Sequence, residues 1–502
     1  MSFFGASAQP PPGSSVADRL PSPPAWIPRV PPIAVAAAAL LLAVVAGRFF
    51  ADGRTTYAAA LVLGVCYSPL VLLNLPLAFA VYVAILFVQD ISALSVAPNS
   101  VGVLVLLAWI GTFISRSART GVLREQSRLL LGLALFALWI SLSVLWASNT
   151  YEAGNGIQSW LTAMFAFVVV LTTLKSARHV RMVTAAYIIG AVASVAYGIA
   201  NGALSAAATS VSETALQGRF TGGGGDPNVQ AAGFLVAMFL CTGMWSLART
   251  RLARVSLLIA FITVAVGFFA TQSRGGFISL GFAAVTGFVL MPRQRKRLLG
   301  LAGAAGVGFA MIAAVSPGAV ARITDIGGGS SGRSDLWAVA WRIFSDHPWH
   351  GIGISNFQTV EPHYTLKSGA LARVELIAEV PHYVHNVYLQ LLTETGIIGL
   401  AIFLIVIIGC LRASWLAARR FDAIGRVGYG DLARAVLMGE LAMLSALFFI
   451  SDGEDWRLWI LLGLGPVMLS LARSTEPALA GVSARADAIR RQPRLAAAAR
   501  PS

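Results

Sequence analysis

Residues 129–147 read LLLGLALFALWISLSVLWA, an apolar run of 19 residues without a charged side chain. About 20 such residues in a helix cross the hydrocarbon core of a bilayer, which is ~30 Å thick. Similar runs recur along the chain, whereas a β-barrel would show alternating segments of about ten residues. The pattern predicts an all-α, polytopic membrane bundle of about 12–14 helices with one long, partly helical external loop.

The composition agrees with a membrane protein, because 57% of the 502 residues are hydrophobic and only 12% are charged. Soluble domains average about 25% charged residues. The predicted spans are 32–47, 56–73, 75–90, 100–115, 129–147, 157–174, 182–200, 229–247, 255–270, 275–291, 298–316, 387–411, 433–450 and 457–472. The bundle would occupy 32–316 and 387–472, with the external loop at 317–386 and disordered cytoplasmic ends at 1–31 and 473–502.

The net charge of +15 is distributed in a way that predicts orientation. Lys and Arg gather in every second loop, at 116–128, 175–181, 249–254, 293–297 and 412–434, and in the tail. Cytoplasmic loops carry such an excess, and it also attracts anionic membrane lipids. The loops with Arg219, Arg274 and 317–386 would then face outward. No basic stripe is interleaved with aromatic residues, so we exclude nucleic acid as a partner.

Histidine is concentrated in the external loop, which holds five of the six in the chain: His347, His350, His363, His382 and His385. Their spacing matches no recognised metal site, so we expect neither a metal nor another cofactor. Each imidazole could be solvated or structural. His385 precedes Asn386 at the mouth of the next span, where a rigid backbone can hold a general base in place.

The same loop contains a helical pattern after Ser334, with Leu336, Trp337, Trp341 and Phe344 on one face. The two tryptophans suit a membrane interface, or the helix simply packs on the bundle. In the last external loop we interpret Asp452, Glu454 and Asp455 as a solvated acidic turn.

Two of the few external arginines border glycine-rich segments at predicted helix starts. Arg219 precedes Gly222–Gly225 and Asp226–Pro227–Asn228, and Arg274 stands between Ser273 and Gly275. No Gly–Lys–Ser/Thr follows the glycine run, which excludes a P-loop. A guanidinium binds phosphate oxygens bidentately, so both are candidate phosphate ligands, although either could instead only extend from the membrane into water.

Several external segments together resemble the O-antigen ligase family, which also contains O-antigen and exopolysaccharide polymerases. They cover roughly residues 215–405 and each is weak alone. The segments are Arg219–Phe220–Thr221–Gly222 with Asp226–Pro227–Asn228, Ser273–Arg274–Gly275–Gly276, Gly332–Arg333–Ser334–Asp335–Leu336–Trp337, His347–Pro348–Trp349–His350–Gly351, His385–Asn386–Val387–Tyr388 and Glu394–Thr395–Gly396.

The resemblance implies a glycosyltransferase of the bacterial inner membrane with a periplasmic active face. The donor would be a glycan on undecaprenyl diphosphate, and the acceptor either lipid A–core, for a ligase, or another glycan, for a polymerase. It implies that Arg219 and Arg274 bind the diphosphate and that His385 acts on the acceptor hydroxyl. Supporting or substrate contacts are expected from Asn228, Arg333, Trp337, His347, Asn386 and Glu394.

Two other classes are possible. A transporter would place ionisable residues at mid-membrane, but Asp90, Glu394 and Glu440 form no evident relay and the chain shows no internal repeat. A scaffold that docks envelope proteins through its external loop would need neither Arg274 nor His385.

Overall fold

The computed structural model describes residues 44–45, 47–88, 109–110, 125–202, 219–290, 295–315, 333–365 and 382–475. Regular structure within these ranges is helical, which confirms the all-α prediction. The predicted spans 32–47 and 100–115 lie largely outside the described residues, as do the end 1–31, most of the end 473–502, and much of the external loop.

The helices begin and end close to the boundaries predicted from hydropathy. They are α2 Thr55–Leu73, α3 Leu75–Ile85, α6 Ser127–Leu142, η2 Ser143–Leu145, α7 Thr150–Thr173, α8 Ala177–Ala200, α10 Pro227–Leu247, α11 Arg251–Ala270, α12 Arg274–Leu290, α13 Arg295–Val315, α15 Arg333–Asp346, α16 Phe357–Thr365, α17 Val387–Ala423, α18 Val427–Ala446 and a last helix, Trp456–Thr475. The helix predicted after Ser334 is confirmed as α15, but it begins at Arg333, so that Ser334 lies within the helix and does not cap it.

Seven helices of the described part are long and apolar enough to cross a membrane. They are Ser127–Leu145, Thr150–Thr173, Ala177–Ala200, Pro227–Leu247, Arg251–Ala270, Val387–Ala423 and Trp456–Thr475. The chain is therefore a polytopic helical membrane protein. The starts of α7 and α18 lie seven and six residues before the predicted spans. Arg412, Arg419 and Arg420 were assigned to a loop but lie in α17. Their neighbours are mostly Ala, Leu and other strong helix formers, so the helix continues after the apolar run ends.

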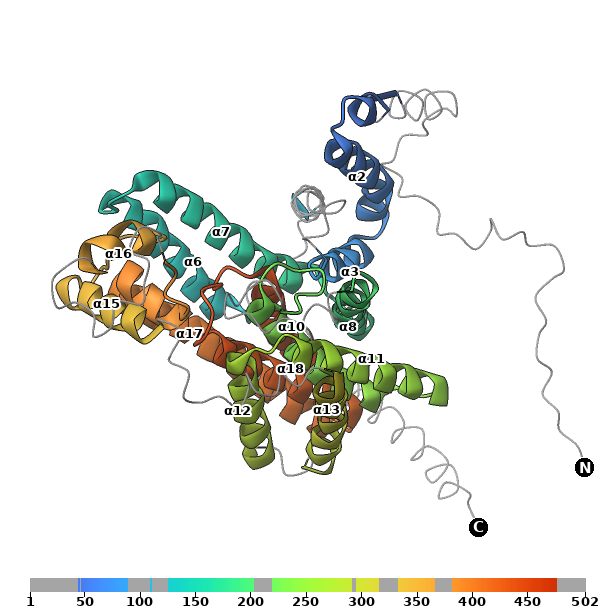
Figure 1. The fold of residues 1–502 in the computed structure, drawn as a ribbon. Helices are drawn as coiled ribbons and strands as arrows, with labels where there is room; N and C mark the ends of the chain where they lie inside the picture. The colour runs from blue at the N-terminus through green and yellow to red at the C-terminus, as the bar shows by residue number, and fades with distance from the viewer. Residues whose placement is uncertain are drawn as a thin grey trace, which may run out of the picture.

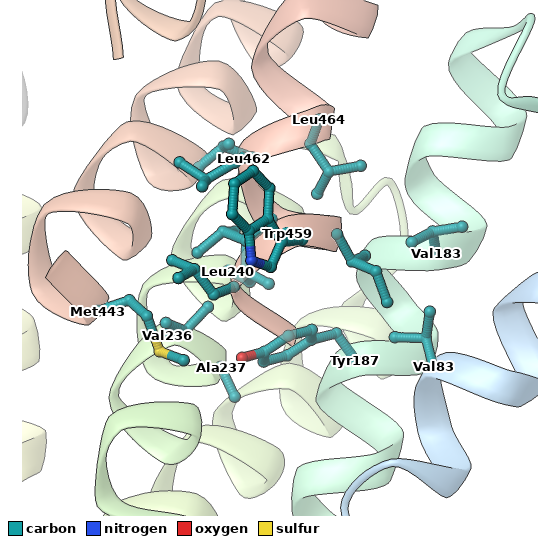
Figure 2. Packing of buried hydrophobic residues seen from close by; sticks show 14 of the residues in the cluster. Val83, Val183, Tyr187, Val236, Ala237, Leu240, Met443, Trp459, Leu462 and Leu464 are labelled. Carbon is teal, nitrogen blue, oxygen red and sulfur yellow. The ribbon is translucent and has the colours of Figure 1, made fainter. Parts of the chain in front are cut away.

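Helix–helix packing concentrates on one apolar core. Figure 2 shows Trp459 of the last helix and Tyr187 of α8 in one cluster, together with Val83 of α3, Val236 of α10 and Met443 of α18. Trp459 and Val83 are fully buried, and Trp459 also meets Trp160 and Phe403 edge-on. Large side chains from five helices thus fix the relative positions of α3, α8, α10, α18 and the last helix.

Side-chain caps set the starts of several helices. Asn149, Ser176, Asp226, Thr250 and Asn386 each accept a backbone N–H from the first turn of the helix that follows. Such a cap satisfies a donor that has no partner within its own helix. Two of these caps, Asp226 and Asn386, lie within segments that carry the family resemblance.

α15 and α16 lie beside the first turns of α17, at one end of the bundle (Figure 1). Val339, Ile343 and Phe357 form a small second core there with Val384, which precedes α17. This is the partly helical part of the loop predicted at 317–386. α15 and α16 are therefore packed against the bundle through this second core.

α17 is interrupted at Gly396, where φ is +69°. The carbonyls of Thr393 and Glu394 accept the N–H groups of Ile352 and Gly353 at 3.0 and 2.9 Å, and Ile397 donates to the carbonyl of Pro348 at 2.9 Å. The segment 348–353 thus satisfies backbone groups that the break exposes, as irregular backbone near a membrane requires.

Gly396→Ala is expected to destabilise the protein by at least ~2 kcal/mol, because an L side chain is strained at this φ and its Cβ would lie 2.2 Å from the carbonyl oxygen of Trp349. The measurement is the melting temperature in detergent. Gly281→Ala on α12 is the control, since its Cβ meets nothing within 4 Å. Equal melting temperatures for the two variants would contradict this account of the break.

Candidate active site

Arg219 is fixed at the corner between α11 and α12. Its Nε donates to the carbonyl of Thr271 at 3.0 Å, and an Nη donates to Oδ1 of Asn228 at 2.8 Å. Thr271 ends α11 and Asn228 lies in the first turn of α10. The half-buried guanidinium is therefore held in one place by two helices.

Asn228 joins the first two arginine segments. Its Oδ1 also accepts a hydrogen bond from the hydroxyl of Ser273 at 2.8 Å, and that hydroxyl accepts the N–H of Gly276 at 3.1 Å. Ser273 thereby closes the first turn of α12, whose first residue is Arg274. Gln272, the residue before Ser273, has a φ of +52°, which turns the chain sharply between α11 and α12. Asn228 thus connects Arg219 to the start of α12, and its supporting role in a substrate site stays a prediction.

Arg333, at the start of α15, approaches the same region. Burial lowers the pKa of its guanidinium, the carboxylate of Asp226 opposes that shift, and the positive charge of Arg274 adds to it. The charges of Arg274, Arg333 and Asp226 thus interact across α12, α15 and the start of α10. Positive charges gathered in this way are favourable where an anion binds.

His385 adjoins this group of charges. Burial lowers the pKa of the imidazole, the positive charge of Arg333 lowers it further, and Asp226 opposes both effects. The histidine is therefore neutral near pH 7, the form that can accept a proton. Its φ of +52° is unusual for a residue other than glycine and fits a position that the surroundings fix.

Asn386 explains how the His385 backbone is held. The Asn386 side chain accepts the N–H of Leu389 at 3.1 Å, and the next residue, Val387, donates to the carbonyl of Leu447 at the end of α18 at 2.9 Å. The start of α17 is thus capped and tied to a second helix. We define the charge cluster as Asp226, Arg274, Arg333 and His385; Arg219 joins it through Asn228 and Ser273.

The remaining predicted supporting residues lie around this charge cluster in different ways. The indole of Trp337 donates to the carbonyl of Val384 at 3.0 Å, so it helps position the segment before His385. Trp341, predicted on the same face, is 57% exposed. His347 is exposed at the other end of α15, with its ring 6.3 Å from that of His350.

Glu394 has a structural position. It is 1% exposed, and its Oε1 accepts the N–H of Phe357 at 3.3 Å and a hydrogen bond from Gln390 at the same distance. The carboxyl therefore connects the start of α16 to α17, below the segment 348–353. Its predicted substrate role remains a prediction.

The prediction of a solvated acidic turn at 452–455 is wrong for Asp455, while Asp452 and Glu454 are half-buried. Asp455 is 9% exposed and binds the guanidinium of Arg457, which is 3% exposed, through contacts of 2.8 to 3.1 Å. Arg457 also donates to Oε1 of Gln230 on α10 at 3.3 Å. Burial raises the pKa values of Asp452 and Glu454, and the charge of Asp226 raises that of Asp452 too. The last loop is thus packed against the start of α10.

The sequence did not predict the hydrogen bond between Arg457 and Gln230, because the two residues are 227 positions apart and no pattern relates them. The close spacing of Asp455 and Arg457 was the one available signal.

Arg457→Met is expected to cost ~3–5 kcal/mol of stability, because it leaves the Asp455 carboxylate buried without its cation. The melting temperature in detergent measures the loss. Adding Asp455→Asn should recover part of it, and a double variant as unstable as the single one would contradict the pairing.

No group of three or more His, Cys, Asp or Glu side chains in the described part of the chain is arranged to hold a metal ion. The fold and the charge cluster define a polytopic membrane protein with a cationic, histidine-containing site at the ends of its helices.

Residues 258–404 match the model of the family described as O-Antigen ligase, and this match supports assigning the chain to that family. The match implies a membrane enzyme of the glycosyltransferase type. The matched region contains Arg274, Arg333 and His385. Arg219 and Asn228 precede this region and form hydrogen bonds with its residues Thr271 and Ser273. The curated proteins include no match to this chain.

Proposed function

We propose that the enzyme transfers a glycan from undecaprenyl diphosphate to an acceptor hydroxyl at the periplasmic face of the inner membrane. Arg219, Arg274 and Arg333 bind the diphosphate, and His385 accepts the proton of the hydroxyl. The observation that carries this proposal is that Asn228 joins Arg219 to the start of α12 by hydrogen bonds, where Arg274 stands, while the charge of Arg274 acts on Arg333 and that of Arg333 acts on His385.

The reaction is a single displacement at the anomeric carbon. The acceptor oxygen forms a bond to that carbon while the bond from carbon to the phosphate oxygen breaks, and undecaprenyl diphosphate leaves with the electron pair. The acceptor proton passes to His385. Guanidinium groups already in place stabilise the negative charge that develops on the leaving diphosphate. An imidazole that is neutral at the working pH serves as the base.

The ligase reaction, with lipid A–core as the acceptor, is our first assignment, in keeping with the description of the matched family. Polymerisation, in which a second lipid-linked glycan is the acceptor, uses the same donor chemistry and is the alternative. Deletion of the gene separates them. Lipid-linked long chains beside bare lipid A–core indicate a ligase, single repeat units on the core indicate a polymerase, and loss of secreted polymer alone indicates an exopolysaccharide polymerase.

The direct test uses the purified full chain, an undecaprenyl-diphosphate-linked glycan and lipid A–core. We expect a larger glycolipid on a gel and release of undecaprenyl diphosphate. If neither lipid A–core nor a second lipid-linked glycan accepts the sugar, the proposed transfer is wrong.

The periplasmic orientation gives a separate prediction. Ala338 on α15 and Arg249 between α10 and α11 are both exposed and lie on opposite sides in our assignment. In spheroplasts, a membrane-impermeant maleimide should label Ala338→Cys at once and Arg249→Cys only after permeabilisation. The parent chain, with its native Cys66, Cys241 and Cys410, is the control and gives the background labelling; Cys241 and Cys410 are buried. The reverse labelling pattern would place the site in the cytoplasm.

A further inference from the structure

The end of α18 is bonded to the start of α17. We call residues 444–449 the α18 end segment. The carbonyl of Leu447, which follows the last residue of α18, accepts the N–H of Val387, the first residue of α17, at 2.9 Å. The hydroxyl of Tyr388 donates to the carbonyl of Leu444 at 2.7 Å. The first N–H groups and the last carbonyls of a helix have no partner within that helix, so the two helix ends satisfy one another here.

These hydrogen bonds fix the backbone beside the proposed base. Only Asn386, whose side chain caps α17, separates His385 from Val387. On the other side of His385, the carbonyl of Val384 accepts the indole N–H of Trp337 at 3.0 Å. The position of the imidazole therefore depends on where the α18 end segment holds the start of α17.

The α18 end segment also contacts the start of α12, which packs along α18. Gly275, the residue after Arg274, leaves no room for a side chain, because its Cβ would lie 2.5 Å from the Cβ of Phe449 and 2.7 Å from the Cγ. Carbon atoms in contact are about 3.5–4.0 Å apart. Glycine at this position thus lets Phe449 pack directly on the backbone that carries Arg274.

We propose that the α18 end segment sets the position of His385 relative to Arg274, with Tyr388 and Phe449 as positioning residues for the transfer. This inference rests on the proposed function, because the relative position matters only if Arg274 binds the donor and His385 is the base. A misplacement of about 1 Å can cost about 100-fold in rate. One short segment in contact with both helix starts limits such a misplacement.

Gly275→Ala tests the contact with α12. The added methyl group should move the start of α12 away from Phe449 by about 1 Å, since the closest atom is the Cβ and rotation of the ring does not relieve the overlap. At a temperature well below the melting temperature, kcat should fall on the order of 100-fold. The KM for the donor should change much less, because Arg219 stays joined to the start of α12 through Asn228.

Gly281→Ala is the matched control for this variant. It adds a methyl group to the same helix at a place where the Cβ meets nothing within 4 Å, and it should change neither kcat nor KM.

Tyr388→Phe tests the contact with α17 by a milder change. It keeps the ring, whose centroid lies 4.4 Å from that of Phe448, and removes the hydrogen bond to Leu444. The value of kcat should fall on the order of fivefold. Tyr364→Phe is its control, because it also removes one hydroxyl donor, which bonds to Asp346 at 2.6 Å, and it should leave kcat unchanged.

The two changes should be coupled, because both displace contacts of the same segment. In the double variant of Gly275→Ala and Tyr388→Phe, the loss of kcat should be smaller than the product of the two single losses. The double variant of Gly275→Ala and Tyr364→Phe should lose no more activity than Gly275→Ala alone.

Three results would overturn the inference. They are a kcat for Gly275→Ala equal to that of Gly281→Ala, a kcat for Tyr388→Phe equal to that of Tyr364→Phe, and single losses that multiply in the double variant. If Gly275→Ala does not fold, the comparison of the two tyrosine variants decides alone.

Failure of the proposed function gives a different pattern. Normal transfer by both Arg274→Lys and His385→Asn would show that the assigned roles are wrong, and the inference would fail with them. Inactivity of those two variants beside a normal Gly275→Ala would refute the positioning role alone.

Discussion

Arg274→Lys should lower kcat/KM for the donor on the order of 100-fold, close to the effect of Arg274→Ala. A lysine keeps the charge but cannot donate two parallel hydrogen bonds to a pair of phosphate oxygens. Arg274 is the first residue of α12, and Ser273 fixes that turn. The backbone that carries the guanidinium is therefore fixed. A lysine at the same position would have the same fixed backbone but not the paired donors.

The transfer assay with purified protein measures this effect. Arg342→Lys is the matched control, because Arg342 is an exposed arginine of α15 outside the charge cluster. Full turnover by Arg274→Lys would show that position 274 needs only a positive charge extending into water, and the bidentate model would fail.

His385→Ala should reduce kcat by about 10³-fold, within the range of 10²–10⁴ typical of general bases. The donor should still bind, since the arginines remain. Because His385 has a φ of +52°, an alanine could also disturb the backbone. His385→Asn avoids this ambiguity, because asparagine tolerates positive φ, and it should be equally inactive.

His363→Ala provides the comparison, as His363 is an exposed histidine on α16. Near-normal transfer by His385→Asn would remove the histidine from the proton-transfer step. In the wild type, burial and Arg333 lower the pKa of His385 below 6.5. The acid limb of kcat/KM should therefore lie below pH 6.5, with the rate rising as the imidazole loses its proton.

The sequence allowed a good prediction of the helices because the information is local. Apolar runs, a capping residue such as Asn386 and the glycine run before Asp226 all lie within a few residues of the boundaries they set. The end of α17 was missed because hydropathy falls at Arg412 while helix propensity does not.

The site was predictable in part. Arg219, Arg274 and His385 were predicted from their segments, and their roles stay predictions. Hydrogen bonds through Asn228 join the first two segments, and the charge of Arg333 couples Arg274 to His385. The cap made by Asp226, the approach of Arg333 to His385, and the Asp455–Arg457 pair under α10 depend on contacts between distant segments. No periodicity encodes such contacts, so only the packed helices reveal them.

The residues of the charge cluster come from four different helices. Asp226, Arg274, Arg333 and His385 stand at or next to the first residues of α10, α12, α15 and α17. A small tilt of any one of these helices would thus change the distance between His385 and the arginines without breaking a bond inside the charge cluster. In the proposed mechanism, the alignment of His385 with the arginines therefore depends on the whole bundle and, through hydrophobic mismatch, on the thickness of the surrounding lipid.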